Sequence, residues 1–325
     1  MKRRTVLQLS AAMLTMPGWA RAQAQKVYRL GWLATTDEAT TRPFLEGALI
    51  PGMGDLGYAV GRNLAVDIRY SRGDAKRLPA LADELITLKP DVLLGIESAC
   101  VAMAAKTSTI PIVNMAGADP VAAGLVKSLA RPGTNVTGMS NQVLTAKHVE
   151  LLAEIVPKLS RIVLINDATN PARESHERMA REAAAAKKLA LLVINATPNP
   201  DGIRAAFAQA GTQRNIGVVV PSSGPMIMVR STIAEEASRL RVPAVYGIAQ
   251  FVDAGGLISY GQNVAESYRK EVPPYVDRIL KGANPAEMPV QQSAKFEMVV
   301  NLKTARALGL TIPPTVLLRA DRVIE

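Results

Sequence analysis

The sequence has 325 residues, of which 48% are apolar, and its only cysteine is Cys100. A chain of this length can bury two cores, and a single cysteine excludes both a disulfide framework and a Cys/His zinc cluster. The net charge of +10 comes from interleaved charged residues with only 4% aromatic residues, which argues against a nucleic-acid-binding protein.

Residues 1–22 have the pattern of a secretory signal peptide. A basic start at residues 2–4 precedes a short apolar run, and the A-x-A site at 20–22 predicts cleavage before Gln23. The apolar run is shorter than the roughly 20 residues of a membrane-spanning helix. Removal of four basic residues leaves 34 basic and 28 acidic groups, or +6, and no cysteine stands at the cleavage site to carry a lipid. We therefore expect a periplasmic protein without a membrane anchor, exported by the Sec or the twin-arginine route.

Short apolar runs alternate with amphipathic stretches along the rest of the chain. Several runs are apolar almost throughout, as strands covered on both faces must be. Between them, the segment 78–88 places its leucines on one helix face, and Asn170-Pro171 fits the start of another helix. This repeated order predicts parallel sheets with right-handed crossovers. The expected strands are 27–33, 64–70, 91–96, 110–115, 161–166, 190–195, 216–221 and 242–247.

The strand–helix pattern restarts after the segment RPGTNVTGMSN, which ends at Asn141. Two series of similar length predict two α/β domains of comparable size. Two late strand-like segments, GGLISYGQN and KFEMVVN, indicate that the chain passes between the domains more than once. We expect a hinge near 139–142, 259–262 and 285–292. The expected first domain is 23–141 plus 261–288, and the expected second domain is 142–260 plus 289–325.

The residues that most enzyme classes need are missing from the sequence. The only two histidines, His148 and His176, stand in helical, charged segments, and neither a G-x-x-x-x-G-K-[ST] loop nor a G-x-S-x-G elbow occurs. The Gly255-Gly256 pair precedes a strand, which is the wrong context for binding phosphate. We therefore expect no cofactor, no metal and no catalytic residue, although an exported enzyme that uses only carboxylates remains an alternative.

Polar turns follow several of the expected strands. In open α/β sheets, ligands bind at this edge, where loops and helix N-termini converge and offer N–H groups to an anion. Ser98, Asp119 and Ser222 taken singly also fit helix caps, so their collective position is what predicts a binding site between the domains. The turns are 35–37, 97–99, 116–120, 166–170 and 222–225.

Four segments are distinctive: RPGTNVTGMS, VYGIAQFVDAGGLISYG, YVDRILKGANPAEMPVQQ and KFEMVVNLKTARALGLTIPPTVLLRADRVIE. They closely resemble the extracytoplasmic substrate-binding family of ABC importers that includes the tryptophan/tyrosine-type binding proteins. The resemblance implies an α/β, type I periplasmic-binding-protein fold, with two Rossmann-like lobes of parallel sheets, a multi-strand hinge and a ligand in the cleft. It also implies a binder that delivers its solute to a membrane permease. Characterised relatives bind aromatic amino acids.

The resemblance and the polar turns together predict the ligand contacts. Asp119 is expected to meet a ligand ammonium, and the amides near Ser98 and Ala99 are expected to hold a carboxylate. Glu97 stands where relatives often have small or hydroxyl residues, so it either favours a cationic ligand end or faces solvent. The full expected set is Thr35, Thr36, Asp37, Glu97, Ser98, Ala99, Ala118, Asp119, Ser140, Asn141, Asn166, Asp167, Ala168, Ser222, Ser223, Tyr246 and Tyr260.

Aromatic side chains near strand ends are candidates to stack on a ligand ring. Tyr246, Tyr260 and Trp32 hold such positions, and each fits core packing equally well. We therefore expect a small carboxylate-bearing solute, an amino acid or an aromatic acid, bound by a monomeric importer component whose other partner is the permease. A sensor of the same fold that docks on a membrane receptor shares every one of these residues and remains the alternative.

Overall fold

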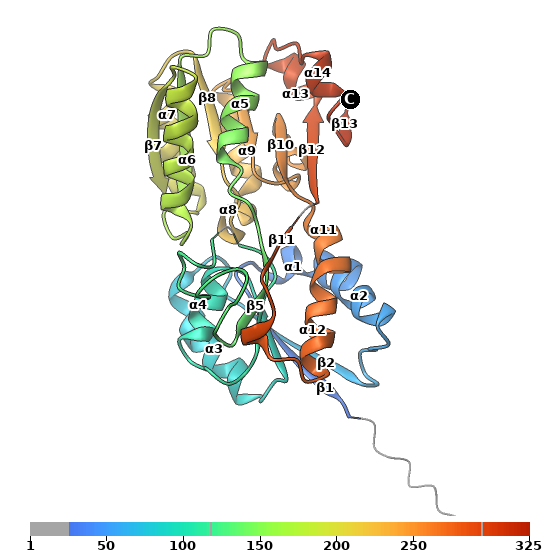
Figure 1. Ribbon diagram of the computed structural model, residues 1–325. Coiled ribbons are helices and arrows are strands. Elements are labelled where there is room, and N and C mark those ends of the chain that lie inside the picture. Colours follow the sequence, from blue (N-terminus) through green and yellow to red (C-terminus); the bar gives the residue numbers. More distant parts are fainter. Residues whose placement is uncertain (1–25, 118, 294) are drawn as a thin grey trace, which may run out of the picture.

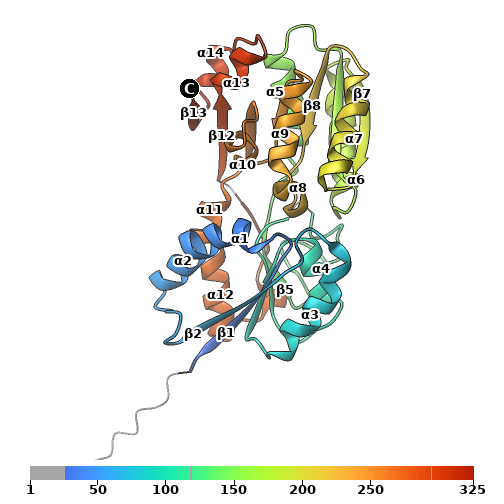
Figure 2. The ribbon, with the colours of Figure 1, turned by 180° about the vertical axis from the view of Figure 1, so that it is seen from behind.

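The computed structural model describes residues 26–117, 119–293 and 295–325, so the expected signal peptide lies outside it. The described chain forms two lobes, each built on one sheet with helices on both faces (Figure 1). Figure 2 shows from behind that the lobes are stacked end to end, with the C-terminus on the lobe that holds the middle of the sequence. No helix of the described residues combines the length and the apolar character that crossing a membrane requires.

Lobe one is built on a six-stranded sheet in the order β11-β5-β4-β3-β1-β2. Its central strand β3 is buried along its whole length, as its apolar sequence VLLG predicts. The strands are β1 (Tyr28–Ala34), β2 (Leu64–Tyr70), β3 (Val92–Gly95), β4 (Ile112–Asn114), β5 (Val136–Ser140) and β11 (Gln291–Gln292). The helices are α1 (Glu38–Phe44), α2 (Ile50–Asp55), α3 (Leu78–Thr87), α4 (Ser98–Ala104), α11 (Val264–Glu266) and α12 (Val272–Leu280).

Lobe two is built on a seven-stranded sheet in the order β13-β12-β10-β9-β8-β6-β7. The strands are β6 (Arg161–Asp167), β7 (Ala190–Ala196), β8 (Ile216–Val220), β9 (Ala244–Tyr246), β10 (Ile258–Gln262), β12 (Phe296–Asn301) and β13 (Arg322–Ile324). The helices are α5 (Thr145–Ile155), α6 (Arg173–Ala186), α7 (Pro200–Gly211), α8 (Gly224–Met228), α9 (Arg230–Arg239), α10 (Gln250–Asp253), α13 (Leu302–Ala307) and α14 (Pro314–Leu317). All eight strands expected from apolar runs are present within a few residues of their expected bounds.

The expected parallel sheets are confirmed, with one antiparallel pair in lobe two. Strand β12 runs antiparallel to β10, with Ile258 opposite Val300 and Gln262 opposite Phe296. The reason is the path of the chain, because β10 leaves lobe two and β12 re-enters it from the hinge, so the two strands run in opposite directions. The neighbouring β12–β13 pair is parallel again.

The chain passes between the lobes three times, as Figure 1 shows. The first passage joins β5 to α5, the second joins β10 to α11, and the third joins β11 to β12. Strand β11 pairs with β5, so residues 291–292 belong to the sheet of lobe one. The third passage therefore begins after Gln292, and the second begins after Gln262.

Helix α12 returns to lobe one and packs beside α2 in both views (Figures 1 and 2). Val272 and Val276 of this helix share a buried cluster with Leu30 and Val92 of the sheet. A second cluster, formed by α3 and α4, covers the opposite face of the same sheet. Lobe two is likewise covered on both faces by separate clusters. Each lobe thus has a complete core of its own, which leaves the surface between them available for a ligand.

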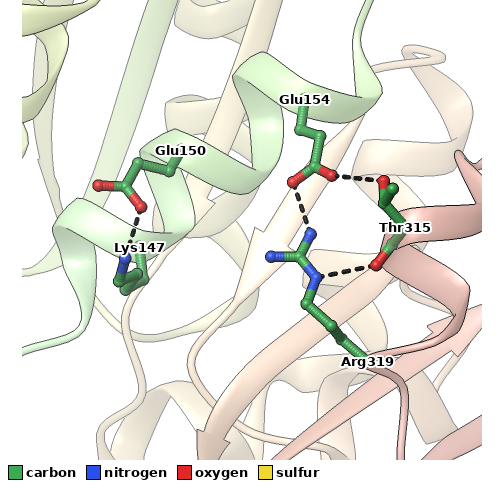
Figure 3. Close-up of polar contacts among 5 residues, drawn as sticks. All are labelled: Lys147, Glu150, Glu154, Thr315 and Arg319. Carbon is green, nitrogen blue, oxygen red and sulfur yellow. Dashed lines mark hydrogen bonds and ion pairs between the residues drawn. The ribbon is translucent and has the colours of Figure 1, made fainter.

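The C-terminal segment is tied to the first helix of lobe two by a polar cluster (Figure 3). Arg319 Nη2 donates to Glu154 Oε2 at 2.6 Å, and Thr315 Oγ1 donates to Glu154 Oε1 at 2.9 Å. Burial alone raises the pKa of Glu154, but these two hydrogen bonds outweigh it and hold the pKa below its usual value. The end of the chain therefore belongs to lobe two.

Candidate ligand-binding site

A large cleft lies between the two lobes, at the strand ends where the polar turns were expected. Its empty volume is about 1170 Å³, including space open to solvent. Side chains of both lobes and of the first two hinge regions line it, including Thr35 of lobe one, Ser222 of lobe two and Gln262 at the end of β10. A pocket of this kind is typical of small-molecule sites at domain interfaces.

The lobe-one wall of the cleft is aromatic. Trp32 comes from the end of β1, Phe44 from the end of α1, and Tyr268 from the turn that follows α11. The Tyr268 ring lies 5.9 Å from Trp32 at 69° and 5.9 Å from Phe44 at 63°, which are edge-to-face contacts between ring centroids. Such pairs hold one another in place. Trp32 and Tyr268 are almost fully buried, so the wall is formed before any ligand binds.

Glu97 lines the same side of the cleft from a strained backbone position. Its φ of 41° and ψ of −102° are rare for a residue with a side chain. The side chain of Asn114 holds this turn, because its Oδ1 accepts from Glu97 N at 3.2 Å and its Nδ2 donates to Met139 O at 2.8 Å. Gly117, at φ 143°, makes room for the Glu97 side chain, because a Cβ at position 117 would lie only 2.5 Å from Glu97 Cγ. A strained backbone conformation that the surrounding contacts hold in place is typical of a functional position.

The wall formed by lobe two and the hinge carries buried polar atoms without partners. Gln262 lies at the end of β10, where the chain leaves lobe two, and Asn141 lies in the first passage. Within the described residues, five atoms of cleft-lining side chains have no hydrogen bond: Asn141 Oδ1, His148 Nδ1, Gln250 Oε1, and Oε1 and Nε2 of Gln262. An unsatisfied buried polar group costs about 1–3 kcal/mol, so a cluster of them indicates a missing partner such as a ligand.

Two buried histidines belong to this wall. His148 Nε2 lies 2.7 Å from the carbonyl oxygen of Tyr260, and His176 Nδ1 lies 2.7 Å from Thr145 Oγ1. Burial lowers the pKa of His148 to about 4, although its hydrogen bond to the Tyr260 carbonyl partly opposes the shift. Burial and the neighbouring His148 likewise lower the pKa of His176 to about 4. Both rings are therefore neutral at physiological pH.

The two lobes touch at the rim of the cleft. Gly224 at the start of α8 lies so close to Thr35 that a Cβ at this position would collide with the Thr35 side chain. A second contact joins Ser175 Oγ to Asp119 Oδ2 at 3.5 Å. These contacts link residues of opposite lobes, so the described conformation is a closed one.

The structure brings some of the expected ligand contacts to the cleft and places others elsewhere. The expected residues that line the cleft are Thr35, Thr36, Glu97, Asn141, Ser222 and Ser223. Ala118 lies outside the described residues. The expected residues that are not part of the lining are Asp37, Ser98, Ala99, Asp119, Ser140, Asn166, Asp167, Ala168, Tyr246 and Tyr260.

Local hydrogen bonds explain where the acidic members of that second group point. Asp37 Oδ1 accepts from Thr40 N at 2.9 Å, and Asp119 Oδ1 accepts from Ala122 N at 2.9 Å. Asp167 accepts from Thr169 and, at 2.6 Å, from Ser223 Oγ. Short acidic side chains satisfy nearby backbone N–H groups, so they turn along the chain and away from the cleft.

The two expected tyrosines are used for packing. Tyr246 is fully buried in the core of lobe two, where its ring stacks on Phe251 at 5.2 Å. The Tyr260 ring packs against Phe296 at 6.0 Å, and its carbonyl oxygen receives the contact from His148. Of the three aromatic candidates, only Trp32 lines the cleft.

Several residues that line the cleft were not predicted from the sequence. They include Phe44, His148, Gln250, Gln262 and Tyr268. One available signal was the position of His148 on the apolar face of its helix, three and four residues before buried leucines. The other was the position of Gln262 directly after an apolar strand. Tyr268 gave no such signal, because it reaches the cleft only through the second passage.

No residue constellation in the described ranges indicates catalysis. No group of three or more His, Cys, Asp or Glu side chains within 26–117, 119–293 and 295–325 is arranged to hold a metal ion. The Cys100 thiol is fully buried next to Asn114, and burial raises its pKa far above the usual range, so it is a poor nucleophile. The cleft is equipped to bind a small molecule.

Comparisons with known proteins agree with this description. The model of the family described as ABC transporter substrate binding protein matches residues 43–324. A tyrosine-binding protein of Clostridioides difficile is 25% identical over 264 residues, which are 80% of this chain and 75% of that protein. A conserved domain protein of Vibrio cholerae superimposes with a TM-score of 0.85 at 28% identity, covering 92% of this chain and all of that one. An ABC domain from Streptococcus pneumonia in complex with L-Trp also gives 0.85, at 24% identity and the same coverage.

Proposed function

Because this chain belongs to the ABC transporter substrate binding protein family, we propose that it captures an aromatic amino acid and delivers it to the permease of an ABC importer. Family membership makes the chain the solute-binding component of such a system. The identity of the solute is the new part of the proposal. The two walls of the cleft differ in chemical character, and this difference supports the proposal. Further support comes from two similar proteins, one named a tyrosine-binding protein and the other solved in complex with L-Trp.

The aromatic wall is the observation that carries the choice of solute. Trp32, Phe44 and Tyr268 form a rigid apolar surface from residues that are far apart in the sequence. A flat ring buried against such a surface gains both apolar burial and ring contacts, worth about 0.5–1.5 kcal/mol for each ring pair beyond the area term. A small polar solute would gain none of these ring contacts.

The charges of the cleft favour an amino acid over an aromatic acid. Glu97 lines the cleft, whereas no Lys or Arg is among the described lining residues. A solute carrying only a carboxylate would bring a second negative charge into a partly desolvated space. A zwitterion brings an ammonium for Glu97 as well, and its carboxylate faces the hydroxyls of Thr35 and Ser222 on opposite lobes.

We place the mature protein in the periplasm, after removal of residues 1–22, as a binder without catalytic activity. Three passages between the lobes form a hinge that lets the cleft open and close with few backbone changes. The contacts of Gly224 with Thr35 and of Asp119 with Ser175 are made only when the lobes are closed. Solute release to the permease would require them to break.

Isothermal titration with matched solutes tests this proposal. L-tryptophan, L-tyrosine and L-phenylalanine are compared with L-leucine and with the deaminated acids indole-3-propionate and 3-phenylpropionate. We expect the aromatic amino acids to bind at least tenfold more tightly than the deaminated acids, because the acids lack the ammonium. Glu97→Gln should weaken the amino acids and leave the acids unchanged. Equal binding of amino acids and their deaminated forms would overturn the choice of solute.

A further inference from the structure

We infer that His148 is a specificity-determining ligand contact whose Nδ1 accepts a hydrogen bond from a neutral N–H or O–H group on the side chain of the bound solute. The inference rests on the proposed function, because it takes the solute to lie in the interlobe cleft. It goes further by naming the chemical group that lobe two recognises. An indole N–H and a phenol O–H are donors of this kind.

The hydrogen bond of His148 to the backbone fixes which ring nitrogen faces the solute. A carbonyl oxygen can only accept, so the 2.7 Å contact with Tyr260 O requires the proton to be on Nε2. In the neutral ring, Nδ1 then carries a lone pair and no proton. His148 is 3% exposed and lines the cleft, and its Nδ1 has no partner in the described part of the chain. The ring therefore holds an unpaired acceptor in the wall of the cleft.

The other unpartnered side chains of this wall are less selective than His148. A carboxamide such as that of Gln262, Asn141 or Gln250 can turn over and offer either its oxygen or its nitrogen. Gln262 has both atoms unpartnered and lies two residues after Tyr260 on the same strand, so it can complete a hydrogen-bonded pocket around almost any polar group. His148 cannot turn over without losing its bond to Tyr260.

The charge of the ring decides between a neutral donor and an ammonium. Burial lowers the pKa of His148 to about 4, so the ring is uncharged at pH 7 and offers no negative charge to a cation. The ammonium of the solute has a better partner in Glu97, which lines the cleft from lobe one. The group that reaches His148 is therefore a second, uncharged donor at the other end of the solute.

An acceptor fixed in this way discriminates against solutes that lack the donor. An isosteric solute without the N–H or O–H would leave Nδ1 buried and unpaired. Sites that hydrogen-bond a solute hydroxyl or N–H reject the analogue without it much more strongly than apolar pockets reject a change of size. We expect preference for L-tyrosine over L-phenylalanine, and for L-tryptophan over 3-benzothienyl-L-alanine, by roughly tenfold to a hundredfold.

A pair of substitutions separates the acceptor role from a structural one. His148→Gln keeps an N–H that can bond to Tyr260 O and removes the acceptor at the Nδ1 position. His148→Asn does the reverse, since its amide stands near the Nδ1 position but cannot reach the carbonyl. Titration of the full-length protein and both variants with the four amino acids should show discrimination lost in His148→Gln and kept in His148→Asn.

Nuclear magnetic resonance of the wild-type protein provides a readout that does not depend on the folding of a variant. With ¹⁵N-labelled histidine, the unprotonated Nδ1 resonance of His148 should move upfield when L-tyrosine or L-tryptophan binds, and should stay in place with L-phenylalanine. Equal weakening of all four solutes in both variants, or an Nδ1 resonance that does not respond, would overturn the inference. If none of the four bound the wild-type protein, the proposed function would fail with it, whereas tight binding without discrimination would refute the role of His148 alone.

Discussion

The two lobes share an architecture and differ in what they bring to the cleft. The lobe-one wall consists of rings that already contact one another, together with Glu97 in a strained turn. The wall of lobe two and the hinge carries neutral amide and imidazole groups among its other side chains, and several of these groups are buried without partners within the described residues. The first wall is complete before a solute arrives, and the second becomes complete only when a solute supplies the missing hydrogen bonds. The equivalent sheet edges of the two lobes therefore carry side chains of different chemical character.

This difference locates affinity and specificity in different parts of the molecule. Ring packing gains free energy from any flat apolar group, so the lobe-one wall selects a class of solute. Acceptors in fixed positions bind a solute with matching donors more tightly than a solute that lacks them. Lobe two therefore selects among the solutes of that class.

Acid should destabilise the protein through the two buried histidines of lobe two. The pKa of each in the folded state is about 4, below the ordinary value of 6.5, so the unfolded chain takes up protons first as the pH falls. Their contribution to stability is complete above pH 6.5 and is lost as the pH falls towards 4. Between pH 7 and pH 5 the free energy of unfolding should drop by about 2 kcal/mol per histidine.

Urea denaturation at the two pH values, followed by far-ultraviolet circular dichroism, measures this loss. The double variant His148→Gln, His176→Asn is the control, and its stability should change much less between pH 7 and pH 5. Equal pH dependence in the variant and the wild type would show that the histidines do not contribute, and would weaken the contrast between the lobes.

Gly224→Ala should prevent full closure and reduce affinity by roughly tenfold or more. A Cβ at position 224 would collide with Thr35, so the rim contact between the lobes has to open. The matched control is Gly54→Ala, where a Cβ meets nothing within 4 Å and the helix gains up to about 1 kcal/mol. Small-angle scattering at saturating L-tryptophan should give a larger radius of gyration for Gly224→Ala than for the control. An identical radius and affinity would contradict closure at this rim.

Phe44→Leu tests the lobe-one wall. Loss of the ring should weaken binding of aromatic amino acids by roughly threefold to tenfold, because one ring contact with the solute is worth about 0.5–1.5 kcal/mol. The same change at Phe207, a core residue of lobe two remote from the cleft lining, should lower stability without changing affinity. Titration calorimetry and thermal melts distinguish the two. Unaltered affinity in Phe44→Leu would mean that the solute does not use the aromatic wall.

Asp119→Ala should have the smallest effect on binding. The side chain lies outside the cleft lining, so its loss removes a cap worth about 1 kcal/mol, through Ala122 N, and one 3.5 Å contact with Ser175 Oγ across the rim, but no contact with the solute. Affinities for L-tryptophan and indole-3-propionate should then change by the same small factor, as they should in Asp37→Ala, a comparable cap. A loss confined to the amino acid would instead give Asp119 the ammonium-binding role that the sequence first suggested.

Most of the fold could be predicted from the sequence because both sheets are covered on two faces. Strands such as β3 and β8 read as unbroken apolar runs, and the family resemblance and two-lobed α/β class are confirmed by the family match and the solved relatives. The direction of β12 was not predictable, because an apolar run looks the same whether its neighbour is parallel or antiparallel. The short strands β11 and β13 carry too few residues to show a pattern.

The candidate site was harder to predict because its walls are assembled across the hinge. Thr35, Glu97 and Ser222 follow predicted strands directly, so the sheet-edge rule placed them in the cleft. The same rule included Asp37 and Asp167, which satisfy local donors instead. Trp32 contacts Tyr268 only because the second passage returns the chain to lobe one, and His148 contacts Tyr260 through long-range packing within lobe two. No local sequence pattern predicts such contacts between residues that are distant in the sequence.

A crystal structure of the protein with L-tryptophan tests the central claim most directly, because it shows which lobe holds which end of the solute. We predict that the indole ring packs on Trp32, Phe44 and Tyr268 of lobe one, with its N–H directed at His148 Nδ1 and its ammonium at Glu97. A ring packed among the amides of lobe two, or a solute bound outside the interlobe cleft, would contradict the division between the two lobes.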